Sequence, residues 1–478
     1  MYHGDTAMRK TKIVCTIGPA CSDEKTLEKL ALAGMNVARL NFSHGTHDDH
    51  SKRIASIKKI RKKLGLPIAI LLDTKGPEYR IGLFKNGKEV INEGDTFTFT
   101  VDDILGDNTR VSVSYKGLPR DMSVGDRILV NNGLLIFDVI EVTDKDVVCK
   151  IVAGGVISDR KSMSFPDKVL KQVYLSEQDK SDLAFGIEQG VDFIACSFVS
   201  CRQDIIDVKN FIEPLGGGDI ELIAKIENRA GVDNIEEICD ECGGVMIGRG
   251  DMGVEIPFEE LPAIQKKIIT KCRLLGKRVI TATEMLESMI QNPRPTRAEI
   301  SDVANAVYDG TSAIMLSGET AAGKYPVLSV ETMARIAEQT ENNIHYKKRF
   351  LNSGFRIQNK MDSISHAICG LSMDIDAKAI AVCSISGTTA RMVSRFRSPV
   401  DIIALSVSEK TFYSLALSWG VTPVMCAVYP SIEVLFYAAA QITQDTLNLE
   451  SGDNIVITGG TTMGKSGSTN TIRIETVV

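Results

Sequence analysis

The sequence predicts an α/β protein: a (β/α)8 TIM barrel with an inserted small β-barrel-like lid domain and a C-terminal α/β domain. Eight short runs of β-branched or apolar residues occur along the chain, and a stretch of helical period follows all but the third. After the third run, short alternating segments separated by Asn, Asp and Gly replace the helix. The length of 478 residues accommodates this plan, because such a barrel alone takes about 250.

The expected barrel strands are short and apolar, as strands buried on both faces should be. They lie at Thr11–Ile17, Asn36–Phe42, Ile68–Asp73, Asp192–Phe198, Glu221–Glu227, Gly244–Arg249, Arg278–Thr283 and Ala313–Glu319. The expected helices are amphipathic, and many of them end near Gly. They lie at Asp23–Ala33, Asp48–Leu64, Gln178–Glu188, Gln203–Ile212, Val232–Cys239, Glu259–Leu274, Ala298–Tyr308 and Leu328–Glu338. Because strands that return through helices become parallel neighbours, we expect one closed barrel over residues 8–75 and 173–345.

The insert is expected over residues 76–172 as an all-β module. Its predicted strands are Thr96–Thr100, Arg110–Tyr115, Arg127–Val130 and Val147–Val152. Since the insert follows a strand, it should lie over the C-terminal mouth of the barrel, where a mobile lid can exclude water.

A third unit is expected over residues 346–478, as an α/β domain with a mostly parallel sheet. Its predicted elements are the helices Met361–Met373 and Ala390–Phe396 and the strands Ala379–Cys383, Asp401–Val407 and Asn454–Thr458. The polar stretch Asn342–Asn359 is expected to link it to the barrel.

Composition excludes several classes of function. The net charge is −6 and a single Trp is present, so neither a basic surface for nucleic acid nor an aromatic stacking platform is indicated. No apolar run reaches the roughly 18 residues that a membrane helix needs. The 11 cysteines are scattered and no signal-like N-terminus is present, which favours reduced thiols and a cytoplasmic protein.

The ends of the predicted barrel strands carry the residues with chemistry. Glu227 and Asp251 offer hard oxygen ligands suited to Mg²⁺ or Mn²⁺, and Lys225 and Arg39 add positive charge beside them. Together these groups fit phosphoryl transfer, which depends on positioning and on neutralising negative charge. The alternative is a structural ion pair between Lys225 and Glu227 inside the barrel.

Two loops of the third unit are candidates for binding a phosphate. Gly459–Ser466 fits the P-loop formula, but the strand-like Thr471–Val477 follows it instead of the required helix, which argues against a Walker-type site. Ser384–Thr389 joins a strand to a helix and offers hydroxyls and amides at the helix start. Ordinary N-capping is the alternative, and we favour a phosphate-bearing ligand because both loops should meet at one sheet edge.

Several long segments resemble the pyruvate kinase family. They are Thr11–Pro19, Met35–Gly45, Leu72–Glu78, Lys225–Asn228 and Asn292–Glu299, and the resemblance extends over essentially the whole chain. It implies phosphoryl transfer from phosphoenolpyruvate to ADP, giving pyruvate and ATP in glycolysis. It also implies Mg²⁺ (or Mn²⁺) and K⁺ as cofactors. The chain departs from the family pattern at Gly248, where Ala is usual, and at Glu284, where Gln is frequent.

The resemblance also implies roles for individual residues. Lys225, Arg39 and Thr283 would be catalytic, and the substrate would contact Arg39, Lys225, Arg249, Gly250, Asp251 and Thr283. Glu227 and Asp251 would hold Mg²⁺, whereas Asn41, Ser43, Asp73 and Thr74 would hold K⁺, and Glu78 matches the residue of potassium-dependent members. The nucleotide would contact Asn41, His44, Arg80 and Lys161.

Regulation is implied in the same way. Family members are homotetramers that bind a sugar phosphate or nucleotide effector, here expected at Ser384, Ser386, Gly387, Thr388, Thr389, Thr461, Lys465 and Ser466. Two other functions stay open from the residues: a Mg²⁺-dependent carbon–carbon lyase acting on a pyruvate enolate, and a non-catalytic phosphometabolite sensor. Pyruvate formation without ADP would indicate the lyase, and sugar-phosphate binding without activity would indicate the sensor.

Overall fold

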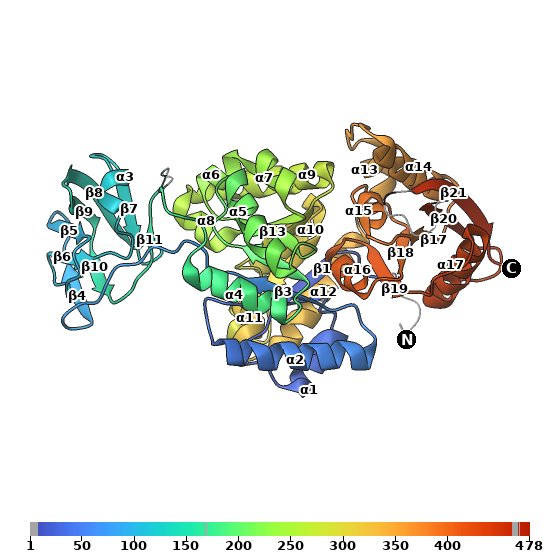
Figure 1. Ribbon diagram of the computed structural model, residues 1–478, viewed down its shortest axis with the longest axis horizontal. Coiled ribbons are helices and arrows are strands. Elements are labelled where there is room, and N and C mark those ends of the chain that lie inside the picture. The colour runs from blue at the N-terminus through green and yellow to red at the C-terminus, as the bar shows by residue number, and fades with distance from the viewer. Residues whose placement is uncertain (1–7, 167, 169, 461–466, 468) are drawn as a thin grey trace.

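The chain forms three bodies in a row: a small β-rich lid, a central barrel and a C-terminal α/β domain (Figure 1). The structure is a computed structural model and describes residues 8–166, 168, 170–460, 467 and 469–478. No helix among these residues is long and apolar enough to cross a membrane. The residue boundaries given above for the three domains stay a prediction.

The central body is a closed barrel of parallel strands in the order β1-β16-β15-β14-β13-β12-β3-β2. The strands are β1 Lys12–Thr16, β2 Val37–Asn41, β3 Ala69–Asp73, β12 Phe193–Cys196, β13 Glu221–Ile226, β14 Gly244–Gly248, β15 Arg278–Ala282 and β16 Ala313–Leu316. Each lies within or matches one of the eight expected runs, so the predicted fold class is confirmed.

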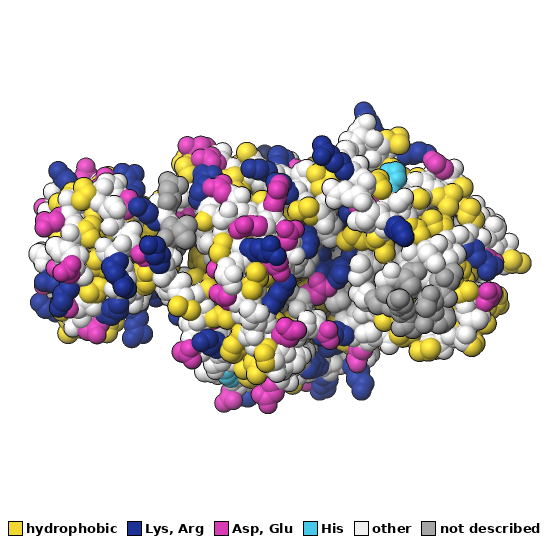
Figure 2. All heavy atoms as spheres, turned by 45° about the horizontal axis from the view of Figure 1, so that its top comes forward, with side chains coloured by type: hydrophobic (Ala, Val, Ile, Leu, Met, Phe, Trp, Pro, Cys, Tyr) yellow, Lys and Arg dark blue, Asp and Glu magenta, His cyan; other side chains and the backbone are white. Residues whose placement is uncertain are grey.

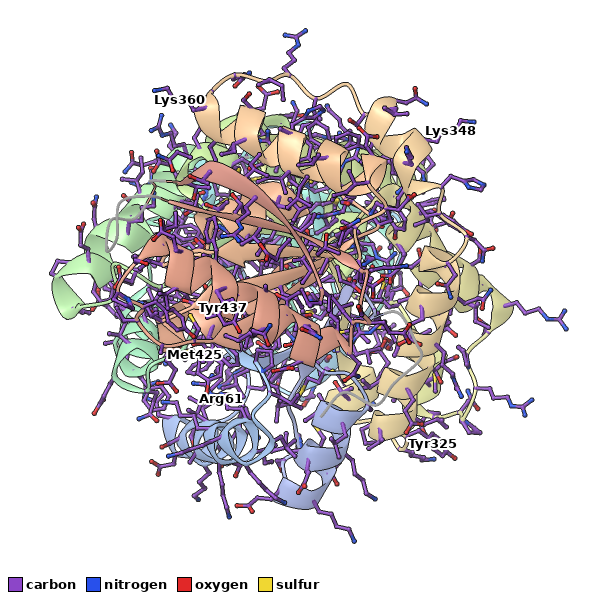
Figure 3. All side chains as sticks on the ribbon, turned by 90° about the vertical axis from the view of Figure 1, so that its right-hand side faces the viewer. Arg61, Tyr325, Lys348, Lys360, Met425 and Tyr437 are labelled. Carbon is purple, nitrogen blue, oxygen red and sulfur yellow. The ribbon has the colours of Figure 1, made fainter. Side chains whose placement is uncertain are left out.

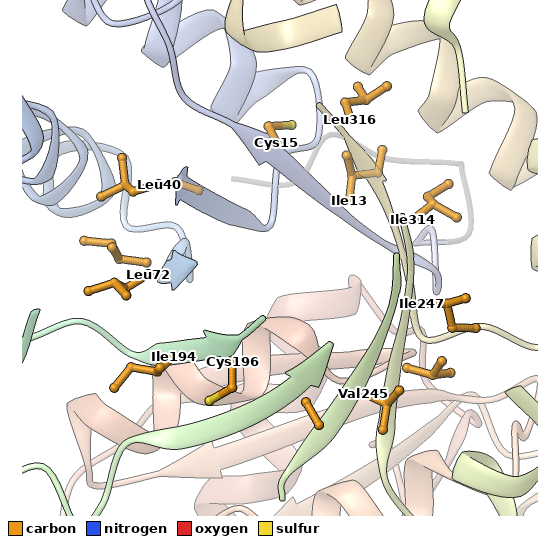
Figure 4. Packing of buried hydrophobic residues seen from close by; sticks show 14 of the residues in the cluster. Ile13, Cys15, Leu40, Leu72, Ile194, Cys196, Val245, Ile247, Ile314 and Leu316 are labelled. Atoms are coloured by element: carbon orange, nitrogen blue, oxygen red, sulfur yellow. The ribbon is translucent and has the colours of Figure 1, made fainter. Parts of the chain in front are cut away.

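The barrel has two apolar layers because successive strand side chains point to opposite faces. Ile13, Leu40 and Leu72 point outward and pack beneath the surrounding helices (Figure 4). Val14 and Leu71, one position along the same strands, belong to the cluster that fills the interior. Strand period alone therefore divides the barrel into a filled interior and a helix-covered exterior.

The surrounding helices begin at strong N-caps. Capping boxes join Thr46 with Asp49, Ser176 with Asp179 and Thr296 with Glu299 at three of them. The helices are α1 Glu24–Leu32, α2 His47–Leu64, α4 Glu177–Glu188, α5 Arg202–Ile212, α6 Arg229–Asp233, α7 Ile235–Glu241, α8 Arg249–Glu255, α9 Leu261–Leu275, α10 Arg297–Asp309, α11 Gly318–Ala321 and α12 Pro326–Glu341. Short 3-10 turns lie at η1 Glu213–Leu215, η2 Phe258–Glu260 and η3 Glu287–Ile290.

Several details of the barrel differ from expectation. The strand expected at Ala313–Glu319 stops at Leu316, and Gly318–Ala321 form α11. The single helix expected at Val232–Cys239 is divided at Asn234, which ends α6 and caps α7. The strand expected to run to Arg249 stops at Gly248, and Arg249 instead begins α8.

The lid forms its own core around three mutually packed rings, Phe97, Phe99 and Phe137. Its elements are β4 Lys88–Ile91, β5 Thr96–Thr100, β6 Arg110–Ser112, α3 Leu118–Asp121, β7 Arg127–Val130, β8 Leu135–Val142, β9 Asp146–Ala153, β10 Gly155–Ser158 and β11 Met163–Ser164. A six-stranded sheet in the order β11-β7-β8-β9-β5-β6 and a β10-β4 pair build it. Figure 2 shows the lid as a separate lobe with Lys and Arg side chains scattered over its face.

The C-terminal domain has a sheet in the order β19-β18-β17-β20-β21, parallel except for the β20–β21 pair. Its elements are α13 Tyr346–Leu351, α14 Lys360–Asp374, β17 Ala379–Cys383, α15 Thr388–Ser394, β18 Asp401–Ser406, α16 Glu409–Ser414, η4 Leu415–Leu417, β19 Val421–Met425, α17 Ile432–Leu447, β20 Asn454–Gly460 and β21 Thr469–Thr476. Helix α17 lies on the outer side, with Tyr437 exposed on it (Figure 3).

The polar stretch expected to be a linker is partly helical. Helix α13 lies within Asn342–Asn359, and its Tyr346 and Phe350 are buried against Trp419 and Phe396 respectively. The few aromatic residues of a polar segment therefore dock it onto the domain that follows.

The C-terminal domain also closes the N-terminal end of the barrel. Ala416 and Leu417 of η4 belong to the same buried cluster as the barrel-interior residues Val14, Leu71 and Ile223. The opposite, C-terminal end of the barrel therefore remains the end at which a substrate can enter.

Candidate active site

Asp73 is the centre of a charged cluster at the C-terminal mouth of the barrel. It is the last residue of β3 and is fully buried. Its Oδ2 accepts a hydrogen bond from Nε of Arg39 at 2.6 Å, and its Oδ1 lies 3.1 Å from Nζ of Lys225. The carboxylate of Asp73 therefore holds both Arg39 and Lys225 in place at the mouth of the barrel.

Lys225 is held between two carboxylates. Its Nζ lies 3.1 Å from Oε1 of Glu227 and donates a hydrogen bond to Oγ of Ser197 at 2.7 Å. Burial alone would lower its pKa, but the charges of Asp73 and Glu227 outweigh burial and raise it to about 12. The ammonium group therefore stays charged at any physiological pH.

Glu227 and Asp251 lie on neighbouring barrel segments and differ in burial. Glu227 is 1% exposed, and its Oε2 accepts from the backbone N–H of Phe198 at 2.9 Å. Burial, with a contribution from Asp251, raises the pKa of Glu227 to about 7 despite the opposing charge of Lys225. Asp251 lies in the first turn of α8 and is exposed.

This pair of carboxylates fits a divalent cation. Ionisation of buried Glu227 is disfavoured as the site stands, and a bound cation between the two oxygen donors would offset that cost. Among the described residues, no group of three or more His, Cys, Asp or Glu side chains is placed to hold a metal ion. Mg²⁺ is usually held by one or two protein carboxylates, and water and substrate oxygens fill its remaining coordination positions.

Thr283 lies in strained backbone directly after β15. Thr283 and Glu284 have φ values of 69° and 54°, which are rare for residues with side chains and rarest for a β-branched one. Oγ1 of Thr283 accepts from the backbone N–H of Gly250 at 2.8 Å, which joins the ends of β14 and β15. The side chain of Arg249 turns away from the mouth and holds this turn: it donates to the carbonyl of Thr283 at 3.1 Å and pairs with Asp302 at 2.7 Å.

Comparison with known proteins decides the family. Residues 8–330 match the model of the pyruvate kinase barrel domain, and residues 362–475 match that of the pyruvate kinase alpha/beta domain. The chain belongs to the pyruvate kinase family. The pyruvate kinase of Clostridium perfringens is 45% identical over 474 residues, covering 98% of this chain and 100% of that protein.

Other relatives agree over the same span. The pyruvate kinase of Geobacillus stearothermophilus is 44% identical and is covered over 80% of its length by 98% of this chain. A crystal structure of a pyruvate kinase from Cryptosporidium parvum superposes with a TM-score of 0.94 at 36% identity, covering 98% of this chain and 96% of that one. The predicted resemblance to pyruvate kinases is thereby confirmed.

The four residues expected to hold K⁺ lie at the adjacent ends of β2 and β3. Asn41 stands opposite Asp73 in the strand register, and its Oδ1 accepts from the backbone N–H of Ser43 at 3.1 Å. Thr74 is buried and its Oγ1 accepts from the backbone N–H of Ser197 at 3.2 Å. The structure brings these oxygen-bearing residues together, and their role as ligands stays a prediction.

The residues expected to bind nucleotide are more dispersed. Arg80 contacts Glu78 and donates to the carbonyl of Arg160 at 2.6 Å, so it braces the base of the lid. His44 is exposed beyond β2, and Lys161 is half-buried in the lid. No contact joins these three side chains to the Asp73 cluster within the described part of the chain. A cleft of about 230 Å³ lies between lid and barrel and is lined by Glu78, Ser162, Asp251 and others.

The described effector residues follow β17 at one edge of the C-terminal sheet, near the start of β21. Oγ1 of Thr389 lies 2.7 Å from Oγ1 of Thr469, and Oγ of Ser386 lies 3.1 Å from Oγ1 of Thr388. Gly387 caps α15 with a φ of 74°, and Ser384 is half-buried at the end of β17. Thr461, Lys465 and Ser466 lie outside the described residues. The segment that follows is strand β21, antiparallel to β20, and not the helix that a Walker-type nucleotide site requires.

Sequence reasoning missed Ser197. Its Oγ accepts from Lys225 and donates to the carbonyl of Thr74 at 2.6 Å, with Asp73 Oδ1 at 3.3 Å. The signal was present, because Ser197 directly follows β12 just as the other site residues follow or end their strands.

Proposed function

We propose that this chain catalyses phosphoryl transfer from phosphoenolpyruvate to ADP, giving pyruvate and ATP. The observation that carries the proposal is the placement of Lys225 between Asp73 and Glu227, beside Arg39, at the open mouth of the barrel. Lys225 and Arg39, held by buried carboxylates, form a preorganised site for the phosphoryl group, which carries negative charge during its transfer.

The protein's own residues would act on the phosphoryl group from two sides. Lys225 would stabilise it during transfer and Arg39 would bind it from the β2 side. Glu227 and Asp251 would hold Mg²⁺ or Mn²⁺, and Asn41, Ser43, Asp73 and Thr74 would hold K⁺. These bound cations would neutralise charge on the phosphoryl oxygens.

The remaining contacts orient the substrate and the nucleotide. The backbone of Arg249, Gly250 and Asp251 would bind the substrate carboxylate. Thr283 would lie on the side from which the enolate carbon of pyruvate receives its proton. Asn41, His44, Arg80 and Lys161 would contact the nucleotide, which requires the lid to move toward the mouth.

Replacing Lys225 with Met tests this proposal. The substitution removes the cation and keeps the length of the side chain, so turnover should fall by a factor of about 10³ or more while the fold is kept. A coupled assay of pyruvate formation measures turnover, and circular dichroism checks folding. Lys52→Met, at an exposed position of α2, is the matched control and should keep full activity. Near-normal turnover of Lys225→Met, or pyruvate formed without ADP, would contradict the proposal.

We also propose that a phosphorylated effector binds at residues 384–389 with the loop 461–466, and that the chain assembles as a homotetramer in the cytoplasm. The contact between Thr389 and Thr469 supports the first part, because it joins the start of α15 to the start of β21. An apolar surface groove of about 900 Å³, lined by Ile300, Tyr308, Leu328 and others, supports assembly. The cysteines are all free thiols, as a reducing compartment favours.

A further inference from the structure

A cluster of cationic side chains lies at the joint between the barrel and the C-terminal domain, at the end of the barrel opposite the candidate active site. It surrounds a small, partly open space beside Ser418 and Trp419. This interface cluster consists of Arg273, Lys277, Arg278, Arg391, Arg395 and Arg397. The first three come from the barrel: Arg273 from α9, Arg278 from β15 and Lys277 from the turn between them. The others come from α15 and the residues after it.

The positive charge of the interface cluster is only partly balanced. Glu221 pairs with both Arg278 and Arg391, and Asp362 pairs with Arg395 at 2.9 Å. Among the described residues, no carboxylate forms an ion pair with Arg273, Lys277 or Arg397. Arg278, Arg395 and Arg397 are buried, whereas Arg273, Lys277 and Arg391 are half-buried. Buried charges are expensive unless a counter-charge meets them, so this excess of cations over two carboxylates favours an anion.

Unused hydrogen-bond donors lie in the same place. Arg397 is 3% exposed, and its Nη1 and Nη2 donate to oxygens of Ser394, Gly310 and Ser312 at 2.9–3.1 Å. Its Nε–H is buried without an acceptor, and so are the Nε–H groups of Arg273 and Arg395. Burial, together with the charge of Arg273, lowers the pKa of Arg397 to about 9. A buried donor without an acceptor is costly, and all three arginines are among the residues that line this space.

The size of the space limits the occupant. Its free volume is about 10 Å³, which is room for one atom-sized guest and too little for a phosphate or sulfate. A water molecule could accept from these N–H groups but would leave the excess charge uncompensated. We propose that the interface cluster binds a monatomic inorganic anion, chloride, which joins the barrel to the C-terminal domain.

Bromide crystallography tests the site directly. Crystals of the full chain, grown with bromide in place of chloride, should show an anomalous peak in contact with Nε of Arg397. Density in the space without an anomalous signal would identify a water molecule and overturn the proposal, and so would an empty space.

Thermal unfolding of the full chain tests the same site in solution. Potassium chloride should raise the unfolding temperature by on the order of 2 °C relative to potassium gluconate at equal ionic strength and equal K⁺, because a ligand that binds only the folded state stabilises it. Arg273→Gln removes one unpaired cation and should abolish this difference. Arg120→Gln, the same charge change at an exposed position of α3 in the lid, should keep it. An equal unfolding temperature in both salts, or a full difference retained in Arg273→Gln, would overturn the proposal.

Discussion

Gly248 decides where the carboxylate of Glu227 can lie. A Cβ at position 248 would come within 2.6 Å of Oε1 and 2.7 Å of Cγ of Glu227, closer than atoms in contact approach. The family usually carries Ala at this position, so the absence of the methyl group gives this chain room for Glu227 directly over the end of β14. The departure at Gly248 therefore affects Glu227, which is proposed to hold the divalent cation.

Gly248→Ala should displace the carboxylate of Glu227 and raise the Mg²⁺ concentration needed for half-maximal activity by about tenfold or less. A titration of activity with Mg²⁺ at saturating substrates measures the effect. Gly253→Ala, where the added Cβ meets only a side-chain carbon of Leu261 at 3.3 Å, should leave the titration unchanged. An unaltered Mg²⁺ requirement in Gly248→Ala would show that Glu227 adapts without cost.

Ser197 positions the ammonium group of Lys225 by accepting a hydrogen bond from it. Ser197→Ala removes the acceptor at 2.7 Å from Nζ, so the ammonium group loses one of its fixed partners. We expect kcat to fall about tenfold with little change in the KM for phosphoenolpyruvate, because the loss affects positioning during transfer more than binding. Ser301→Ala, at an exposed position of α10, is the control and should keep kcat and KM unchanged. A change confined to KM would argue that Ser197 contributes to binding instead.

Between elements, the strained turn after β15 depends on helix α10. Asp302 of α10 binds Arg249 through both carboxylate oxygens, at 2.9 and 2.7 Å, and Arg249 in turn holds the carbonyl of Thr283. Both bonds come from Nη1 of Arg249, and charge-assisted hydrogen bonds of this kind are stronger than neutral ones. The positive-φ backbone at Thr283 is thus maintained by a helix that does not itself reach the mouth.

Asp302→Asn should loosen this turn and raise the KM for phosphoenolpyruvate several-fold, on the order of 1 kcal/mol of lost binding. Steady-state kinetics at saturating ADP provide the measurement. Asp138→Asn breaks the Arg127 pair within the lid, a matched Arg–Asp contact far from the turn, and should leave KM unchanged. Equal kinetics in both variants would mean that backbone packing alone maintains the turn.

The elements that were predicted correctly are those with a strong local period. The barrel strands are continuous apolar runs, and their ends could be aligned because parallel strands finish at the same edge. Helix α8 was missed because Gly250 and Gly253 make its sequence a poor helix former. Strand β8 is absent from the predicted strands, although Asn131-Asn132-Gly133 adopts positive φ and joins β7 to β8 as a hairpin.

The whole molecule contains contacts that no local pattern reveals. The interface cluster draws Arg278, Arg391 and Arg397 from three segments, and neither their spacing nor their neighbours mark them as partners. The candidate site was predictable to the extent that its residues end strands, whereas the residues that brace it, such as Asp302, come from the helical layer. Long-range packing therefore sets the limit of sequence reasoning here.

Glu221 links the two large domains and gives their docking a pH dependence. Burial opposes its ionisation, but the guanidinium groups of Arg278 and Arg391 overcome this and hold its pKa at about 2, below the ordinary 4.5. The unfolded chain therefore takes up the proton first as the pH falls. The stabilisation is complete above about pH 4.5 and is lost between there and pH 2, and it amounts to roughly 3 kcal/mol.

Glu221→Gln should lower the free energy of unfolding at pH 7 by about that amount, and the difference from the unchanged chain should shrink below pH 4.5. Urea unfolding at pH 7, 5 and 4 measures both effects. Glu236→Gln, an exposed carboxylate paired with Lys271, should leave the unfolding free energy nearly unchanged. A constant difference at every pH would exclude the ionised carboxylate as the cause.

Ala416 and Leu417, which close the N-terminal end of the barrel, limit how domains can be exchanged between relatives during evolution. A barrel separated from the C-terminal domain would expose the apolar side chains of its floor, including Val14 and Leu71, to water. Recombination between relatives at this joint would therefore succeed only when the interior residues of the barrel end and the η4 residues that cover them are exchanged together. The lid has its own aromatic core and can diverge or be replaced as a module. The barrel and the C-terminal domain are one unit of evolutionary exchange, even though they are two units of architecture.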